Sequence, residues 1–204
     1  MRRDLIPAAV AVVVFTVLCG LAYPLLVTGV SQVVFPGKAD GSLIKRDGRV
    51  VGSKLIGQEF KRDTGKKDAD GNPILVPIPR YFQSRPSATG YAADGTFFNN
   101  QGPNQKDLAD QLRANADDFL QQNPGTRRSD IPPDAVTTSA SGIDPHISKA
   151  NARIQARRVS RVRAMPLHRI AQLIDANTDG RFLIFGEPGV NVLELNLALD
   201  KEQQ

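Results

Sequence analysis

The chain has 204 residues, with 26 basic and 21 acidic side chains, and 41% of its residues are apolar. This length suggests one domain or two small ones. The apolar residues are unevenly distributed, because the 31 residues from Leu5 to Phe35 carry no charge. That segment excludes a purely soluble cytosolic enzyme. A multi-spanning channel acting alone is also excluded, since no later segment approaches about 18 consecutive apolar residues.

Residues 1–35 are predicted to form an N-terminal tail and a retained transmembrane anchor helix. A helix rises about 1.5 Å per residue, so this segment can cross a hydrocarbon core of about 30 Å. The alternative is a cleaved signal peptide, whose apolar part usually has about 7–15 residues and ends in a small-x-small site. Lipid attachment at Cys19 is disfavoured, because Leu18 stands where a small residue is expected.

Four residues inside the anchor are candidates for contact with another membrane helix. Pro24 is expected to kink the helix or loosen it locally, which a membrane helix tolerates when neighbouring helices support it. Gly20, Thr28 and Gly29 are small, so a second helix can approach closely there. We therefore expect partner-helix packing at Gly20, Pro24, Thr28 and Gly29.

The orientation of the anchor stays open from the residues alone. Arg2 and Arg3 precede it, and a short Arg-Arg tail is typical of an uncleaved signal anchor. The positive-inside rule would keep the following domain in the cytoplasm, although long domains can cross a membrane regardless of charge. The basic residues that follow the anchor most closely are Lys38, Lys45, Arg46, Arg49 and Lys54.

Residues 36–204 are predicted to form one soluble α+β domain. Residues 41–60 indicate a β-hairpin, because two short apolar runs flank Asp47-Gly48, a dipeptide typical of tight turns. Residues 61–80 are charged and then rich in proline, so they are expected to form an exposed loop.

Three helices are expected next. The first runs from Pro103 to Gln122, and Asn123-Pro124-Gly125 ends it. The second begins at Asp144-Pro145, with an N-cap followed by proline at the first helical position, and ends near Pro166. A short third helix starts at Pro166.

Two strands are expected at the C-terminal end, over 181–185 and 190–199. A turn from Gly186 to Gly189 separates them. Apolar residues at alternate positions are typical of a half-buried strand. In the second segment these residues are Leu193, Leu195, Leu197 and Leu199.

The densest polar cluster lies between Ser139 and Ser148. The preferred interpretation is a helix cap in which Asp144 accepts from backbone N–H groups. The free N–H groups of such a helix end would also suit a phosphate or another anion. A hydrolase triad of Ser141, Asp144 and His146 is the third interpretation, although a hydrolase elbow reads Gly-x-Ser-x-Gly after a strand. The candidate nucleotide- or partner-binding residues are therefore Ser139, Ser141, Gly142, Asp144 and His146, and no catalytic residue is assigned.

Two other kinds of site find little support. Residues 61–66 lack the first glycine of a Walker loop, since Phe60 stands there, and they lack the Asp-Lys-Thr-Gly-Thr of ion-pump phosphorylation. No metal ligand set is expected either, because the spacing of His146, His168 and Cys19 fits no zinc site. His168 is expected on the surface of the third helix.

Arginines recur every four residues along the second predicted helix. Arg153, Arg157 and Arg161 form a basic stripe, with Arg158 and Arg163 alongside. Such a stripe can attract nucleic acid or anionic lipid. No aromatic residues interleave to stack on bases, so a solvated or partner-facing stripe is preferred and no nucleic acid is expected.

Several separated motifs carry a family resemblance. They occur in a fixed order after the anchor with its Pro24 and cover nearly the whole chain. The motifs are Gly52-Ser53-Lys54-Leu55-Ile56-Gly57-Gln58, Tyr81-Phe82-Gln83-Ser84-Arg85-Pro86-Ser87-Ala88, the cluster from Ser139 to Ser148, Gln155 with Arg158-Val159, and Gly186-Glu187-Pro188 with Asn191-Val192-Leu193 and Leu195-Asn196. The sequence resembles the C subunit of the Kdp high-affinity potassium-transporting P-type ATPase. It departs from that family by the insertion at 61–80 and by residues 97–104.

The resemblance implies a non-catalytic accessory subunit beside a potassium-channel-like subunit, an ATP-hydrolysing subunit and a small membrane peptide. It implies a single-pass protein of the bacterial inner membrane, with the folded domain on the periplasmic side. It also implies an effect on the ATP affinity of the pump, and ATP as a possible ligand of this chain. The alternative function is a membrane-anchored exported hydrolase that uses Ser141, Asp144 and His146.

Overall fold

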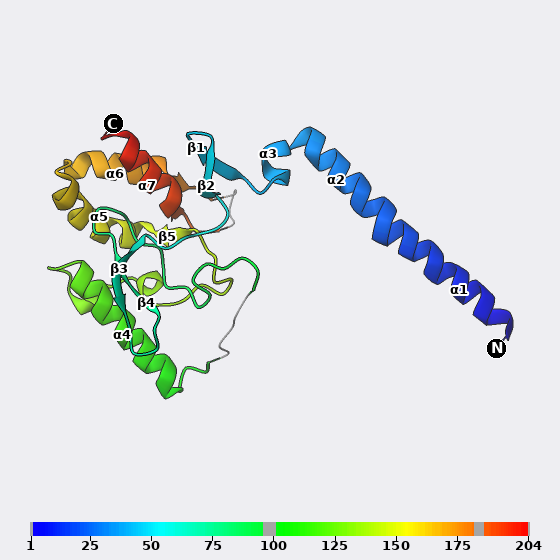
Figure 1. The fold of residues 1–204 in the computed structure, drawn as a ribbon, viewed down its shortest axis with the longest axis horizontal. Coiled ribbons are helices and arrows are strands. Elements are labelled where there is room, and N and C mark those ends of the chain that lie inside the picture. Colours follow the sequence, from blue (N-terminus) through cyan, green and yellow to red (C-terminus); the bar gives the residue numbers. More distant parts are fainter. Residues whose placement is uncertain (1, 96–100, 182–185, 204) are drawn as a thin grey trace. The chain divides into compact units, whose positions relative to one another are not determined.

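The computed structural model describes residues 2–95, 101–181 and 186–203. The chain divides into two compact units, Met1–Ser53 and Lys54–Gln204. Both contain helices and short antiparallel strands (Figure 1), which confirms the predicted α+β class.

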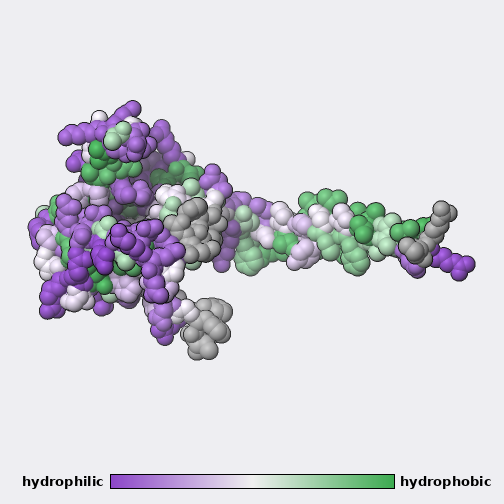
Figure 2. Space-filling view, turned by 90° about the horizontal axis from the view of Figure 1, so that it is seen from below, coloured by the Kyte–Doolittle hydropathy of each residue, from purple (hydrophilic) through white to green (hydrophobic). Residues whose placement is uncertain are grey.

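The first unit begins with one long helix. Helix α1 (Arg2–Val17), a π-helical turn (Leu18–Ala22) and helix α2 (Tyr23–Val34) follow one another without a break. Within this stretch, Arg3–Val34 is long and apolar enough to cross a membrane, and its residues are not buried by other parts of the described chain. Figure 2 shows hydrophobic side chains along its surface. The prediction of a single long apolar helix at the N-terminal end is confirmed, and its length and composition suit a membrane span.

The π-helical turn explains how the helix accommodates Pro24. A proline has no N–H group and cannot donate to the carbonyl one turn earlier. Here the N–H of Tyr23, the preceding residue, donates to the Leu18 carbonyl, so the turn is one residue wider than an α-turn. The expected local loosening before Pro24 is therefore present.

The predicted hairpin follows in the same unit, after the short helix α3 (Pro36–Ala39). Strands β1 (Leu43–Arg46) and β2 (Arg49–Ser53) pair antiparallel, with Arg46 opposite Arg49. The two residues of the turn, Asp47 and Gly48, have φ values of 51° and 76°. Positive φ at both central positions is the signature of the tight turn that matches strand twist, and Asp-Gly tolerates it.

Near the start of the second unit, residues 61–80 differ from the predicted loop. The segment expected to be an exposed loop forms a second antiparallel hairpin, with strands β3 (Lys61–Lys67) and β4 (Pro73–Pro77). Its exposure is confirmed, since every residue of β3 is exposed. The Asp68 side chain organises the turn by accepting from the backbone N–H groups of Asp70 and Asn72 at 3.0 and 2.8 Å. The segment forms strands because its backbone groups pair with one another, and exposed polar residues do not prevent that pairing.

The described remainder of the second unit contains four α-helices and a small sheet. The helices are α4 (Lys106–Gln122), α5 (Lys149–Arg163), α6 (Leu167–Ala176) and α7 (Val192–Lys201). The sheet has the order β5-β7-β6, from β5 (His146–Ser148), β6 (Thr178–Asp179) and β7 (Gly189–Asn191). Two short 3-10 turns, Arg128–Asp130 and Pro133–Ala135, connect α4 to this part. The predicted first and third helices are confirmed to within a few residues.

Two predictions about this region are wrong. The second helix begins at Lys149, because Asp144 and Pro145 precede strand β5 rather than the first helical turn. Of the strand expected over 190–199, only Val190 and Asn191 lie in a strand, β7, and the residues from Val192 onward form helix α7. Its fully buried positions Val192, Leu195, Asn196 and Leu199 follow helical spacing, which outweighs the alternation of leucines. The strand expected over 181–185 falls mostly outside the described residues.

The core of the second unit lies among α5, α6, α7 and the small sheet. Its fully buried side chains include Phe82, Val159, Ile170, Val190 and Leu199. Phe82 comes from the segment after β4, and both its backbone N–H and its carbonyl are hydrogen-bonded to the Asn196 side chain of α7. Its N–H donates to Asn196 Oδ1 at 2.8 Å, and its carbonyl accepts from Asn196 Nδ2 at 2.9 Å. The segment 82–91 is thereby placed against the helices, where it builds the site.

Candidate functional site

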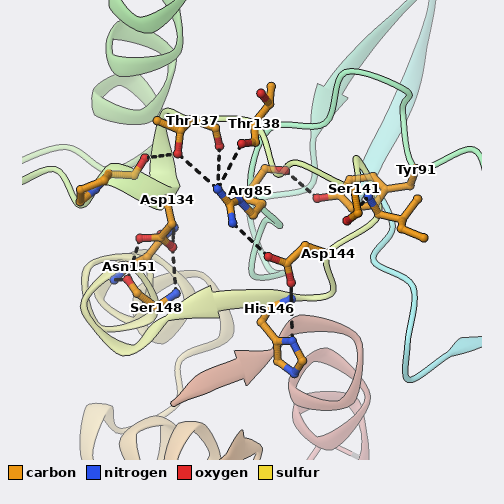
Figure 3. A network of polar contacts seen from close by, with 12 residues as sticks. Arg85, Tyr91, Asp134, Thr137, Thr138, Ser141, Asp144, His146, Ser148 and Asn151 are labelled. Atoms are coloured by element: carbon orange, nitrogen blue, oxygen red, sulfur yellow. Dashed lines mark hydrogen bonds and ion pairs between the residues drawn. The ribbon is translucent and has the colours of Figure 1, made fainter. Parts of the chain in front are cut away.

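The polar cluster predicted between Ser139 and Ser148 is organised around Arg85. Arg85 Nη1 donates to Asp144 Oδ2 at 3.0 Å. Its Nη2 donates to the carbonyl of Thr138 at 3.2 Å and to the Thr137 carbonyl and Oγ1 at 3.4 and 3.3 Å. Figure 3 shows the guanidinium group enclosed by these acceptors. Arg85 therefore fixes the loop before β5, a role that the sequence analysis missed although Arg85 belongs to a motif of the resemblance.

Asp144 closes a local turn instead of capping a helix. Its Oδ1 accepts from the His146 backbone N–H at 3.0 Å. Burial raises the pKa of this carboxyl group, but hydrogen bonds from His146 and Arg85 outweigh burial and lower the pKa to about 2. Asp144 is therefore ionised at neutral pH and serves as the counterion of Arg85.

His146 lies between two carboxylates. Its Nδ1 is 3.5 Å from Asp144 Oδ1, and its Nε2 is 2.7 Å from Asp179 Oδ2 on β6. The hydrogen bond with Asp144 raises the pKa of His146, burial opposes this effect, and Asp179 adds to it. The half-buried ring thus links β5 to the loop before it and to β6 of the same sheet.

The helix cap that was assigned to Asp144 is made by Ser148. Ser148 Oγ accepts from the Asn151 N–H at 3.1 Å and donates to Asp134 Oδ1 at 2.7 Å. Asp134 Oδ2 also accepts from the Ser148 N–H and from Asn151 Nδ2, at 2.8 and 2.9 Å. The first turn of α5 is therefore occupied by protein groups (Figure 3). A phosphate at this helix end would have to displace the Asp134 carboxylate.

Gly142, Ser139 and Ser141 lie in the loop that precedes Asp144. Gly142 has a φ of 72°, and a Cβ atom there would lie 2.9 Å from Thr89 Oγ1, so glycine is required. Its carbonyl accepts from Ser87 Oγ at 2.5 Å. Ser139 Oγ is buried without a hydrogen-bond partner among the described residues. Ser141 is exposed, and its Oγ accepts from the Ile143 N–H at 3.3 Å.

The geometry does not form a hydrolase triad. A triad requires one ring nitrogen of the histidine to face the serine and the other to face the acid. Both ring nitrogens of His146 face carboxylates, and Figure 3 shows its ring well apart from Ser141. The cluster brings Asp144 and His146 together but leaves Ser141 outside their contact.

Two arginines of the predicted basic stripe belong to the interior. Arg158 is 8% exposed and donates to the carbonyls of Pro79 and Tyr81, to Asn123 Oδ1 and to Gln155 Oε1. Arg163 is also buried and donates to Asp200 Oδ1 at 2.8 Å. Both positions were expected beside a solvated stripe, and that expectation is wrong for them. Backbone carbonyls from a distant segment provide their acceptors, and helical spacing gives no signal of such partners.

The exposed part of the stripe consists of Arg153, Arg157 and Arg161. His168 is exposed on α6, as expected. Across residues 2–95, 101–181 and 186–203, no group of three or more histidine, cysteine, aspartate or glutamate side chains is arranged to hold a metal ion.

The candidate residues of the anchor lie on its exposed surface. Gly20, Pro24, Thr28 and Gly29 are all exposed in the long helix. A Cβ atom at Gly20 or Gly29 would meet no atom within 4 Å. These glycines are thus not required by packing inside the described part of the chain, which leaves their small size available to another helix.

Comparison with known proteins gives one consistent result. Residues 5–201 match the family model described as KdpC, "K+-transporting ATPase, c chain". A protein named "Potassium-transporting ATPase KdpC subunit" from Caldanaerobacter subterraneus subsp. tengcongensis is 45% identical over 93% of this chain and 90% of its own. Proteins of the same name are 47% identical in Bradyrhizobium diazoefficiens, over 98% of both chains, and 48% identical in Caulobacter vibrioides, over 98% and 94%.

Proposed function

This chain belongs to the KdpC family of K+-transporting ATPase c chains, and from that membership we propose that it is a non-catalytic accessory subunit. It stabilises an ATP-driven potassium uptake pump and raises the ATP affinity of the subunit that hydrolyses ATP. The observation that carries this proposal is the family match over residues 5–201, which includes both the anchor and the folded unit.

The partners we propose are a potassium-channel-like subunit, an ATP-hydrolysing P-type subunit and a small membrane peptide. The anchor contacts them through Gly20, Thr28 and Gly29, whose exposed surfaces allow close approach of a second helix. The folded part lies on the periplasmic side of the bacterial inner membrane. We propose that the effect on ATP affinity reaches the ATP site through contacts between subunits.

The polar cluster supports an indirect effect on ATP. A bound triphosphate is usually met by uncommitted arginine, lysine or backbone N–H donors. Arg85 is paired with Asp144, and Asp134 occupies the first turn of α5. Ser139, Ser141, Gly142, Asp144 and His146 are therefore better suited to shaping a protein contact than to holding a nucleotide.

The test of function uses the assembled complex. Deletion of residues 54–204, with the anchor kept, should abolish potassium-stimulated ATP hydrolysis. Omission of the whole chain should raise the ATP concentration needed for half-maximal activity in any complex that still assembles. If complexes without this chain showed the same ATP dependence as complete complexes, the affinity role would be wrong.

Two further experiments test the anchor. Gly20→Leu and Gly29→Leu should lower the amount of partner subunits that co-purify, because closely packed helices cannot admit the added side chains. Val13→Leu is the matched control, since it changes little volume in the same helix. A reporter that is active only in the periplasm, fused after Gln204, should be active. Activity of a cytoplasmic reporter alone would reverse the proposed topology.

A further inference from the structure

The second unit contains a cleft of about 650 Å³ that the polar cluster does not fill. It is lined by residues of β4, α4 and α5, together with residues of the segment that carries Arg85. Figure 1 shows the β3–β4 hairpin beside α4, and residues of both line the cleft. Its volume lies within the range of about 300–1,000 Å³ that is usual for ligand sites.

The lining combines an apolar surface with side-chain amides. Leu75 and Val76 of β4 and Phe119 of α4 supply apolar area, and Leu75 is 45% exposed. The amides come from the segment after β4, from α4 and from α5. They belong to Gln83, Asn115, Gln121, Gln122, Asn151 and Gln155.

One part of the lining is rigid before anything binds. Gln155 Oε1 accepts from the Gln83 N–H at 2.7 Å, and its Nε2 donates to the Gln83 carbonyl at 3.0 Å and to Asn151 Oδ1 at 2.9 Å. Arg158 holds the neighbouring segment through the carbonyls of Pro79 and Tyr81. A surface that is already ordered loses little conformational entropy on binding, which favours affinity.

Another part of the lining has unused hydrogen-bonding groups. The amides of Gln121 and the half-buried Gln122 have no hydrogen-bond partner among the described residues. Arg85 Nε is buried and also lacks an acceptor in the described part of the chain. A buried donor without an acceptor costs about 1–3 kcal/mol. An occupant that offers both carbonyl and N–H groups would satisfy these positions.

The charges of the lining favour a neutral occupant. Lys61 is paired with Glu59 at 2.8 Å, and Arg85 is paired with Asp144. Arg158 donates to carbonyl and amide oxygens, and the exposed Asp118 adds a negative charge to the lining. Lys61, Arg85 and Arg158 are thus engaged by protein acceptors, and the carboxylates of Glu59 and Asp118 belong to the same lining. A polyanion is disfavoured, whereas a polypeptide backbone offers uncharged donors and acceptors in alternation.

We propose that this cleft binds an extended, uncharged polypeptide segment of a neighbouring subunit of the transport complex. The inference rests on the proposed function, since it needs a partner chain. The segment lies between β4 and α4, places its apolar side chains on Leu75 and Phe119, and exchanges backbone hydrogen bonds with Gln122 and Arg85.

Photo-crosslinking in the assembled complex tests the proposal. A benzoylphenylalanine at Gln121, which is exposed and lines the cleft, should form a covalent adduct with one defined segment of a partner subunit. Benzoylphenylalanine in place of Gln111, which is exposed on the same helix but outside the cleft, should not form that adduct. Gln122→Trp, which fills the cleft, should abolish the adduct from position 121, whereas Gln111→Trp should leave it. Mass spectrometry identifies the linked peptide.

Three outcomes overturn the proposal. In the first, position 121 forms an adduct with lipid or glycan only. In the second, no adduct forms although the complex contains all its subunits. In the third, the adduct persists undiminished in the Gln122→Trp variant. Co-purification of the subunits with the unmodified chain is measured in parallel. If the subunits do not co-purify, the proposed function fails; if they co-purify without the adduct, only the cleft proposal fails.

Discussion

Arg85 and Asp144 are 59 positions apart in the chain, yet Arg85 Nη1 and Asp144 Oδ2 are 3.0 Å apart. The side chains are 19% and 30% exposed, so water screens the pair only in part. The pair joins the segment after β4 to the loop before β5. It therefore holds the polar cluster together, and the same Arg85 also lines the cleft.

Removal of Asp144 should destabilise the second unit. Asp144→Ala leaves Arg85 without its counterion and the His146 N–H without an acceptor, and we expect a loss of about 2 kcal/mol in the free energy of unfolding. Urea unfolding of the full chain in detergent, followed by circular dichroism, measures it. Asp144→Asn keeps an acceptor for His146 and should lose less. Equal losses for both variants would contradict the role of Asp144 as an acceptor for the His146 N–H, and an Asp144→Asn variant as stable as the unmodified chain would contradict the role of the charge.

The same pair predicts an acid dependence. The pKa of Asp144 is lowered from 3.8 to about 2 in the folded chain. A lowered pKa gives stability that is present above the unfolded pKa and lost as the pH falls through the folded pKa. Unfolding free energy should therefore decline between about pH 4 and pH 2, and Asp144→Asn should show a shallower decline over that interval.

His146 predicts a dependence of the opposite sign. Its pKa is raised above 6.5 by Asp144 and Asp179. A raised pKa gives stability that is complete below the unfolded value and lost as the pH rises through the folded value. Stability should fall as the pH rises above about 6.5, and His146→Gln should flatten that slope. Urea unfolding at a series of pH values measures the slope, and NMR titration of the His146 ring checks the direction of its pKa shift.

Two adjacent arginines of α5 should behave very differently. Arg158→Ala leaves the carbonyls of Pro79 and Tyr81 without their donor in a buried place, so we expect a loss of about 3 kcal/mol. Arg157→Ala changes an exposed side chain and should alter stability by less than about 0.5 kcal/mol. Thermal unfolding compares the two variants. Similar midpoints would show that Arg158 does not hold the segment 79–83.

The cap of α5 gives another matched pair. Ser148→Ala removes the oxygen that accepts from the Asn151 N–H and should cost about 1–2 kcal/mol. Ser141→Ala, in the exposed turn, should cost much less. Hydrogen exchange at the first turn of α5 should increase only in the first variant, and an increase in both would contradict this assignment of the cap.

The local sequence was sufficient for the features that depend on nearby residues. The uncharged segment from Leu5 to Phe35 defines the long apolar helix, because its length and apolar composition together suit a bilayer span. Asp47-Gly48 defines the first hairpin, because two successive residues of this kind accept positive φ. The order of motifs was sufficient for the family.

The tertiary structure alone decided the features that depend on distant partners. Alternating leucines indicated a strand over 190–199, but from Val192 onward burial against α6 and β7 selects the helical face of α7. Asp144 resembled a helix cap, yet Arg85 approaches from another segment and holds it in a turn. Arg158 was predicted beside an exposed stripe, but in the folded chain it is buried and donates to the carbonyls of Pro79 and Tyr81. The hydrogen bonds of a polar side chain are set by whichever groups folding brings near, and neighbours in the sequence do not specify those groups.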